Sequence, residues 1–131
     1  MVNLAAPLPV LRSFDEAKAR EFYIGFLGFT VDWEHRFEPE APLYMQLSRD
    51  SCVLHVSEHF GDGAPGTCLF LPMDDISGYR AELLAKEYRH ARPGLVEQPW
   101  GWREMHVGDP FGNTLRFAER IAEPAQSRGA P

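Results

Sequence analysis

Apolar and polar residues alternate along several stretches of this chain, and this alternation predicts β-strands. The clearest case is residues 29–37, where polar residues separate Phe29, Val31, Trp33, His35 and Phe37. A period of two places these five side chains on one face of a strand, which is therefore expected to be largely aromatic. Shorter runs of the same kind predict further strands at residues 4–11, 43–48, 52–57, 67–71, 102–107 and 114–118.

One stretch near the N-terminus follows the helical period instead. Ser13 and Glu16 have the spacing of a capping box, so a helix is expected over residues 14–27. Gly28 suits the left-handed position that ends a helix. The buried face of this helix is expected to carry Ala19, Phe22 and Phe26.

The same order of elements then occurs a second time. A loop rich in glycine at residues 60–66 marks the midpoint, and a second helix is expected over residues 76–86, capped by Asp74 or Asp75. The sequence thus predicts an α+β domain over residues 1–120, made of two modules at about 4–60 and 66–120. A sheet covered by a helix on one face leaves its other face bare, so pairing the two bare faces would form a curved sheet around a cavity.

Both ends of the chain have features that limit regular structure. Pro7 and Pro9 cannot donate hydrogen bonds to a neighbouring strand, so the first strand is expected at a sheet edge or at an interface. At the other end, residues 121–131 are dominated by alanine, proline, serine and glycine, which predicts a flexible tail.

Composition narrows the possible partners. The chain has 131 residues and 44% apolar residues, without the run of about 20 that spans a bilayer and without a leader-like N-terminus, so a cytoplasmic location and no membrane partner are expected. Cys52 and Cys68 form no close pair and are expected to be reduced.

With 19 acidic and 13 basic residues the net charge is −6, and the absence of a basic cluster argues against nucleic acid as a partner. An acidic surface favours a cationic ligand, although it also serves solubility alone.

Several short motifs occur in a characteristic order. The second half contains Glu-Gln-Pro-Trp-Gly at residues 97–101, Arg103-Glu104, and Asp-Pro-Phe-Gly-Asn at residues 109–113; the first half contains Glu-Phe-Tyr at residues 21–23 and Leu-Gly-Phe at residues 27–29. Over about residues 8–120 the chain resembles the glyoxalase/bleomycin-resistance proteins of the vicinal oxygen chelate superfamily, and is most similar to the bleomycin-binding resistance proteins. The resemblance implies paired βαβββ modules in a homodimer with ligand-binding clefts. It also implies a first strand that is exchanged between subunits in some members.

Enzymes of this superfamily hold a divalent metal on side chains that project into the cavity. By the resemblance, the four ligand positions fall at or near Leu8, His55, Cys68 and Arg116. Leucine cannot ligate a metal, and arginine stays protonated, so neither a metal nor another cofactor is predicted. A buried Arg116 would need a partner, either Glu104 on the neighbouring strand or an acceptor on a ligand.

The remaining candidates are aromatic. Flat heteroaromatic ligands stack on aromatic rings, and cations bind to the ring faces. The predicted function is therefore non-catalytic binding and sequestration of a cationic, aromatic glycopeptide antibiotic of the bleomycin type. The alternatives are a metal-dependent enzyme of the superfamily (a glyoxalase-type lyase, an extradiol dioxygenase or a thiol transferase) and a binder of another small molecule. The residues expected to contact the ligand are Trp33, Phe37, His55, Phe60, Trp100, Trp102, Glu104 and Arg116, with Glu34, Glu38 and Glu58 attracting its charge.

Overall fold

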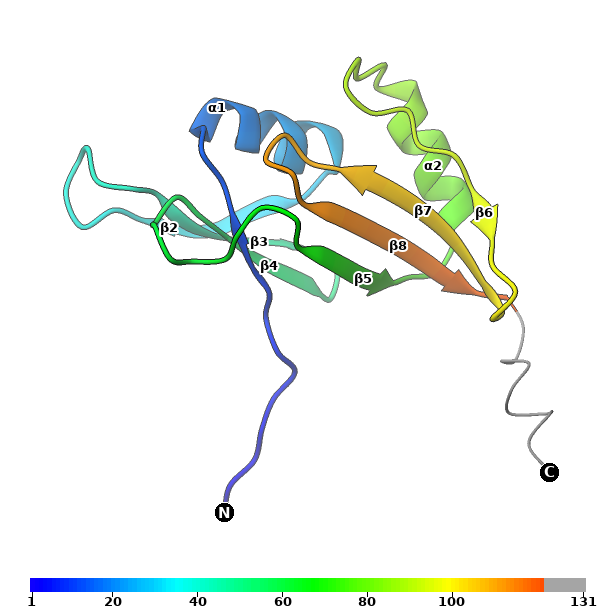
Figure 1. The fold of residues 1–131 in the computed structure, drawn as a ribbon, viewed down its shortest axis with the longest axis horizontal. Helices are drawn as coiled ribbons and strands as arrows, with labels where there is room; N and C mark the ends of the chain where they lie inside the picture. The colour runs from blue at the N-terminus through cyan, green and yellow to red at the C-terminus, as the bar shows by residue number, and fades with distance from the viewer. Residues whose placement is uncertain (122–131) are drawn as a thin grey trace. The chain divides into compact units, whose positions relative to one another are not determined.

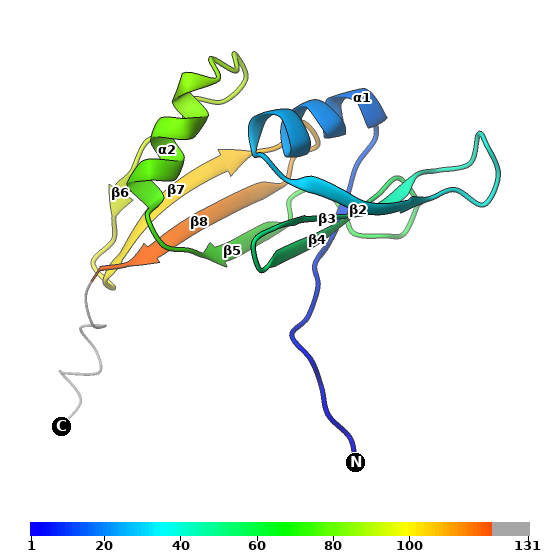
Figure 2. The ribbon, with the colours of Figure 1, turned by 180° about the vertical axis from the view of Figure 1, so that it is seen from behind.

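The first half of the chain forms a four-stranded sheet with a helix over one face (Figures 1 and 2). The computed structural model describes residues 1–121, which divide into two units, one comprising Met1–Thr67 and one that begins at Cys68. In the first unit the strands lie in the order β1-β4-β3-β2; β1 runs parallel to β4 and the other pairs are antiparallel. Its elements are β1 (Val10–Arg12), α1 (Glu16–Ala19), η1 (Arg20–Phe26), β2 (Thr30–His35), β3 (Tyr44–Arg49) and β4 (Cys52–Ser57).

The core of this unit lies between the helix and the sheet. The predicted helix face is confirmed, since Ala19, Phe22 and Phe26 are all buried. Gly28 has a φ of 81°, as expected for the residue that ends the helix. The sheet contributes alternate residues to the same core, namely Leu11, Met45, Leu47, Leu54 and Val56.

The helix differs from the prediction in its start and in its winding. It begins after Asp15, whose side chain accepts a hydrogen bond from the Lys18 amide at 2.9 Å, so Asp15 rather than Ser13 is the N-cap. From Arg20 onward it is a π-helix, in which the Leu27 amide donates to the Phe22 carbonyl five residues earlier. Apolar periodicity alone does not distinguish the two windings.

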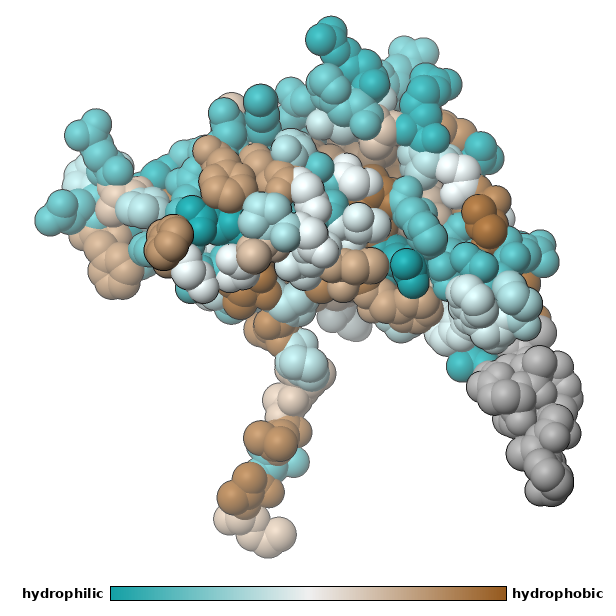
Figure 3. All heavy atoms as spheres, in the orientation of Figure 1, coloured by the Kyte–Doolittle hydropathy of each residue, from teal (hydrophilic) through white to brown (hydrophobic). Residues whose placement is uncertain are grey.

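The predicted first strand at residues 4–11 is too long. Only Val10–Arg12 pairs with β4, with one further hydrogen bond from the His55 amide to the Pro9 carbonyl at 2.9 Å. Residues 1–8 are exposed, and Figure 3 shows this N-terminal segment leading away from β1 with apolar groups along it. The missing N–H groups of Pro7 and Pro9 explain why the strand starts late. Its predicted edge position is confirmed.

The second unit repeats the arrangement with the strand order β5-β8-β7-β6, and β5 is parallel to β8 as β1 is to β4. The α+β prediction with two βαβββ modules is therefore confirmed. On the helix, Tyr79 and Leu83 are buried. The elements are β5 (Cys68–Pro72), α2 (Ile76–Ala85), β6 (Val96–Glu97), β7 (Trp102–Gly108) and β8 (Thr114–Arg120). The predicted tail lies, apart from Ile121, outside the described residues.

A carboxylate from the sheet holds the start of α2. Asp75 is the N-cap of α2, one of the two predicted alternatives, and its side chain accepts a hydrogen bond from the Gly78 amide at 3.1 Å. Its backbone is left-handed, with a φ of 58°. The Glu119 carboxylate on β8 accepts the backbone amides of Asp75 at 3.0 Å and of Ile76 at 3.1 Å. These hydrogen bonds lower the pKa of Glu119. Glu119 thus joins the first turn of α2 to the sheet beneath it.

Replacing Glu119 with alanine is expected to lower the free energy of unfolding by about 1–2 kcal/mol, because two helix amides lose their acceptor. Urea denaturation at pH 7 measures this loss. Since the folded-state pKa lies below the ordinary value of 4.5, the stabilisation is present at neutral pH and disappears as the pH falls from that value through the lower one. Glu82→Ala, which removes a surface ion pair with Lys86 at 3.8 Å, is the control and should change stability by less than about 0.5 kcal/mol. Equal losses in the two variants would contradict the capping role.

Candidate functional site

The face of the first sheet that the helix does not cover is aromatic. Met45 and Leu47 point into the core, so Tyr44 and Gln46 between them point to the open face. The register of β2 shifts by one residue here, because Val31 pairs with Leu47 and Trp33 pairs with Gln46. This β-bulge at Asp32 turns Trp33 to the open face. The prediction that Val31 and Trp33 share a face is therefore wrong.

Trp33, Tyr44 and His55 form a tight aromatic group on this face. The Trp33 and Tyr44 rings are stacked, with centroids 5.9 Å apart and an interplanar angle of 8°. His55 meets Trp33 edge-on at 5.4 Å and Tyr44 at 5.2 Å. Trp33 nevertheless remains 44% exposed, so much of its ring faces outward.

Hydrogen bonds fix the orientation of His55 in this group. The Gln46 amide donates from Nε2 to Asp32 at 3.0 Å, which leaves its oxygen to accept from His55 Nε2 at 2.9 Å. His55 Nδ1 then accepts from the Tyr44 hydroxyl at 2.6 Å. Burial, together with the charge of Asp62, raises the pKa of Tyr44, which keeps this hydroxyl protonated as a donor. Both ring nitrogens of His55 are therefore engaged.

An open pocket of about 330 Å³ adjoins the aromatic group. Phe37 stands at its edge, 76% exposed, with its ring edge-on to His35 at 4.6 Å and to His59 at 5.9 Å. Asp62 supplies a carboxylate, which accepts a hydrogen bond from the Ser57 hydroxyl at 2.8 Å. The pocket is lined by Trp33, His35, Phe37, Tyr44, His59 and Asp62.

Some predicted site residues of the first unit lie elsewhere. Phe60 is 96% exposed and lies 5.9 Å from the Arg12 guanidinium rather than in the pocket lining. Glu34 forms an ion pair with Arg20 of the helix at 2.9 Å, so it is on the covered side of the sheet. Glu58 accepts the Leu43 amide at 2.9 Å. The acid that lines the pocket is Asp62, which the sequence analysis did not select.

Some of the open-face and pocket residues that the sequence analysis did not select could have been found from the sequence. Tyr44 and Gln46 alternate with three apolar residues at positions 43, 45 and 47, so the open face of β3 follows from the sequence. His59 and Asp62 lie in the loop after β4, where no periodicity applies. Their contribution to the pocket depends on the path of that loop.

In the second unit, the open face carries a buried carboxylate. Trp102, Glu104 and His106 alternate along β7 toward this face, while Met105 and Val107 enter the core. Glu104 is 1% exposed. Its two oxygens accept hydrogen bonds from three side chains: Gln98 at 3.3 Å, Trp100 Nε1 at 3.1 Å and His106 Nε2 at 2.8 Å.

Arg116 is the fourth neighbour of Glu104. Its Nε lies 3.7 Å from Glu104 Oε1, so the ion pair anticipated from the sequence is present. Burial favours the neutral carboxyl, but the three hydrogen bonds and the Arg116 charge outweigh burial and lower the pKa of Glu104. The Arg116 side chain is 38% exposed, so it is less buried than predicted.

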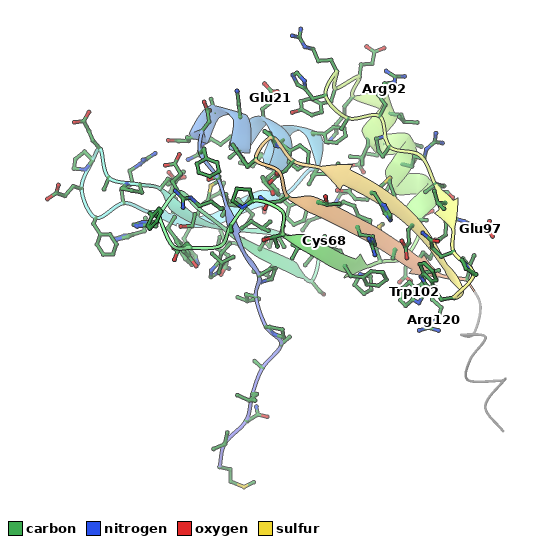
Figure 4. All side chains as sticks on the ribbon, in the orientation of Figure 1. Glu21, Cys68, Arg92, Glu97, Trp102 and Arg120 are labelled. Carbon is green, nitrogen blue, oxygen red and sulfur yellow. The ribbon has the colours of Figure 1, made fainter. Side chains whose placement is uncertain are left out.

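The two tryptophans of this unit have different environments. Trp100 uses its indole N–H to hold Glu104 and is 45% exposed. Trp102 meets Phe70 edge-on at 5.1 Å and has the Arg120 guanidinium 4.7 Å from its ring centre. Figure 4 shows Trp102 and Arg120 together where β7 begins and β8 ends. Trp100 thus keeps an exposed ring face, whereas Trp102 is partly buried between Phe70 and Arg120.

The residues at the family's metal positions do not fit a metal. In the two sheets Val10 pairs with His55 and Phe70 with Arg116, so His55 and Arg116 occupy equivalent places. His55 has both nitrogens engaged, and a guanidinium at the matching place repels a cation. Within residues 1–121, no three His, Cys, Asp or Glu side chains are grouped so that they could hold a metal ion.

Among residues 1–121, none of the helices has the length and apolar character needed to cross a membrane. No curated protein matches the sequence.

Solved structures with similar folds include both binding proteins and enzymes. A bleomycin-binding protein complexed with bleomycin is 23% identical, with a TM-score of 0.68 over 89% of this chain and 99% of that chain. A bleomycin resistance determinant encoded on the transposon Tn5 is 21% identical, with a TM-score of 0.68 over 91% and 100% of the two chains. A glyoxalase-related enzyme from Clostridium phytofermentans is 18% identical, with a TM-score of 0.71 over 92% and 98%.

These likenesses agree on the fold. The family model described as "Glyoxalase superfamily protein" matches residues 1–123, which is nearly the whole sequence. With two βαβββ modules of the expected topology, the chain belongs to the glyoxalase superfamily.

Proposed function

We propose that this protein binds a cationic, aromatic small molecule of the bleomycin type and sequesters it without chemical change. The observation that carries the proposal is the stacked pair of Trp33 and Tyr44 beside a pocket that contains Asp62. An exposed ring in this setting can stack with a flat heteroaromatic group. The Asp62 carboxylate is placed to attract a positive charge on the same ligand.

Two further facts support this choice of ligand. The chain carries a net charge of −6, which favours the approach of a cation. One of the similar folds is a bleomycin-binding protein complexed with bleomycin, although at 23% identity this likeness concerns the fold alone. The proposal keeps Trp33, Phe37 and His55 as ligand contacts and adds Tyr44, His59 and Asp62, because Trp33 and Phe37 line the pocket together with these three residues and His55 adjoins Trp33 and Tyr44. For Trp100, Trp102, Glu104 and Arg116, contact with the ligand remains a proposal.

A titration with metal-free bleomycin tests the proposal. Tryptophan fluorescence is expected to be quenched, with saturation at submicromolar concentrations, because the proposal places an aromatic group of the ligand on the Trp33 ring. Elemental analysis of the protein purified without chelator is expected to show less than one transition metal ion per chain. A flat titration together with one tightly bound metal would instead favour the enzyme alternative, and a flat titration without metal would favour another ligand.

Replacing Asp62 with asparagine is expected to weaken bleomycin binding roughly threefold to tenfold, because asparagine keeps an acceptor for Ser57 but removes the charge. The effect should shrink as salt is raised. Glu21→Gln serves as the control, since Glu21 lies on the helix, which covers the other face of the sheet (Figure 4). An equal change in both variants would show that net charge, not Asp62, attracts the ligand.

The proposal includes a homodimer, as the sequence analysis expected. Size-exclusion chromatography with light scattering, at several protein concentrations, measures the oligomeric state directly. Bleomycin at saturating concentration is expected to leave the dimer mass unchanged.

A further inference from the structure

The loop that joins β2 to β3 carries one wall of the pocket in the first unit. Its residues, 36–43, follow the last strand pair, and Figure 1 shows the loop extending beyond the sheet. Pro39 and Pro42 have no N–H group, so the loop can form few backbone hydrogen bonds of its own. Phe37 in this loop lines the pocket and is largely exposed. The position of its ring therefore depends on what holds the loop.

Arg36 holds this loop from the opposite face of the sheet. His35 and Phe37 line the pocket, so Arg36 between them points to the side that the helix covers. Its guanidinium donates from Nη1 to the Ala41 carbonyl at 3.0 Å and from Nη2 to the Glu16 carboxylate. One side chain thus ties both ends of the loop to the first turn of α1.

Glu16 is well placed to keep Arg36 in this position. Its second oxygen accepts a hydrogen bond from Arg20 Nε at 2.9 Å, one turn further along the helix. The Arg20 hydrogen bond, opposed by burial and aided by Arg36, lowers the pKa of Glu16, so the carboxylate is ionised at neutral pH. The side chains of Arg36 and Glu16 are partly buried, and a guanidinium fork with two acceptors has a defined orientation.

We propose that Arg36 is a positioning residue for the pocket, which fixes Phe37 beside the space that the ligand occupies. Arg36 acts through the loop and does not itself contact the ligand. The Phe37 ring meets His35 edge-on at 4.6 Å and His59 at 5.9 Å, so movement of the loop would change both contacts. The effect on affinity rests on the proposed function, whereas the placement of Phe37 is a property of the protein alone.

The ring resonances of Phe37 test its placement without a ligand. In the free parent protein, the neighbouring imidazole rings should displace these NMR signals from the values of an unstructured phenylalanine. Arg36→Gln should return them by more than half of that displacement, because the shorter neutral side chain loses the ion pair with Glu16. Arg36→Lys should give an intermediate result, since it keeps the charge but loses the fork that serves two acceptors.

Arg20→Gln is the matched control. It removes the same charge from the same group of ion pairs, but Arg20 donates to Glu16 and Glu34, which belong to the helix and to β2 rather than to the loop. The Phe37 signals should therefore stay in place. Equal displacement in Arg20→Gln and Arg36→Gln would overturn the proposal, and thermal melts of each variant establish that it is folded during the measurement.

Calorimetric titration with metal-free bleomycin tests the consequence for binding. Phe37→Ala should weaken binding roughly twofold to tenfold, the range of a single aromatic contact. Arg36→Gln should weaken binding by a similar factor, although loss of a positive charge alone would strengthen the binding of a cation. Unchanged or tighter binding in Arg36→Gln would overturn the positioning role.

The double variant shows whether Arg36 acts through Phe37. When Phe37 is already alanine, adding Arg36→Gln should cause no further loss of affinity, because the ring that Arg36 positions is gone. Losses that add independently would overturn this role.

The two arms of the experiment separate this inference from the proposed function. A parent protein that does not bind bleomycin would contradict the proposed function, and the Phe37 resonances would still decide whether Arg36 positions the ring. Conversely, unchanged Phe37 resonances in Arg36→Gln would overturn the inference and leave the proposed function standing.

Discussion

Replacing Glu104 with alanine is expected to lower the free energy of unfolding by about 2–3 kcal/mol, which would make it one of the most damaging polar substitutions in the chain. Glu104 is buried and organises Gln98, Trp100, His106 and Arg116. Removing one partner of a fully buried ion pair costs about 3–5 kcal/mol. The expected loss is smaller here because Arg116 and His106 are partly exposed and can be hydrated.

Urea denaturation at pH 7 measures the loss, and Glu97→Ala provides the comparison. Glu97 also pairs with an arginine, at 3.1 Å, but its side chain is 63% exposed, so its removal should cost less than about 1 kcal/mol. Equal losses in the two variants would contradict the prediction that the buried Glu104 cluster stabilises the fold more than an exposed ion pair does.

Glu104 should also contribute to the pH dependence of the protein's stability. Burial opposes ionisation of Glu104, but the hydrogen bonds and the Arg116 charge outweigh burial and lower its pKa. The contribution of Glu104 to the free energy of unfolding is therefore fully present above the ordinary pKa of 4.5. It is lost as the pH falls from that value through the lower folded-state pKa. Glu104→Gln should therefore have a flatter stability profile over this acidic range than the parent.

Replacing Trp33 with alanine is expected to weaken bleomycin binding roughly 30-fold or more, or about 2 kcal/mol, as for other central aromatic contacts. Trp33 is the exposed member of the stacked pair and also lines the pocket. Because it is 44% exposed, the stability should fall by only about 1 kcal/mol. Calorimetry is the appropriate measurement, since the variant loses part of the fluorescence signal.

Two companion variants sharpen this test. Trp33→Phe should recover part of the affinity, because it keeps a smaller ring in the stack. Phe14→Ala removes another exposed aromatic residue of the same unit, one that contacts Arg12 and is absent from the pocket lining, and should leave affinity unchanged. An unaltered dissociation constant in Trp33→Ala would place the ligand away from this face.

Most of the fold could be predicted from the sequence, because the signals were local. Alternation located most of the strands, glycine located the end of the first helix at Gly28, and the start of the second helix was narrowed to Asp74 or Asp75. The late start of β1 follows from prolines whose effect was recognised but underestimated. The Glu119 cap of α2 joins residues more than forty positions apart, and no local pattern carries that information.

The candidate site was harder to predict than the fold. The sequence indicated Trp33 and His55 correctly as residues of the open face, yet the argument for Trp33 used an alternation that the bulge at Asp32 interrupts. Trp100 was expected to contact a ligand; its N–H is engaged by Glu104, a role that the sequence did not indicate, and its ring is 45% exposed. Asp62 and His59 reach the pocket through the course of a loop, which depends on tertiary packing.

The bulge at Asp32 has a consequence for how relatives of this protein diverge. After the bulge, each residue of β2 pairs with a different residue of β3 than it would without the extra residue. The bulge therefore sets whether each of these side chains faces the core or the open face. Gain or loss of one codon in this strand could exchange the whole set of presented side chains at once, without any substitution among them. Insertions and deletions in this strand, and not point mutations alone, therefore change which side chains the open face presents.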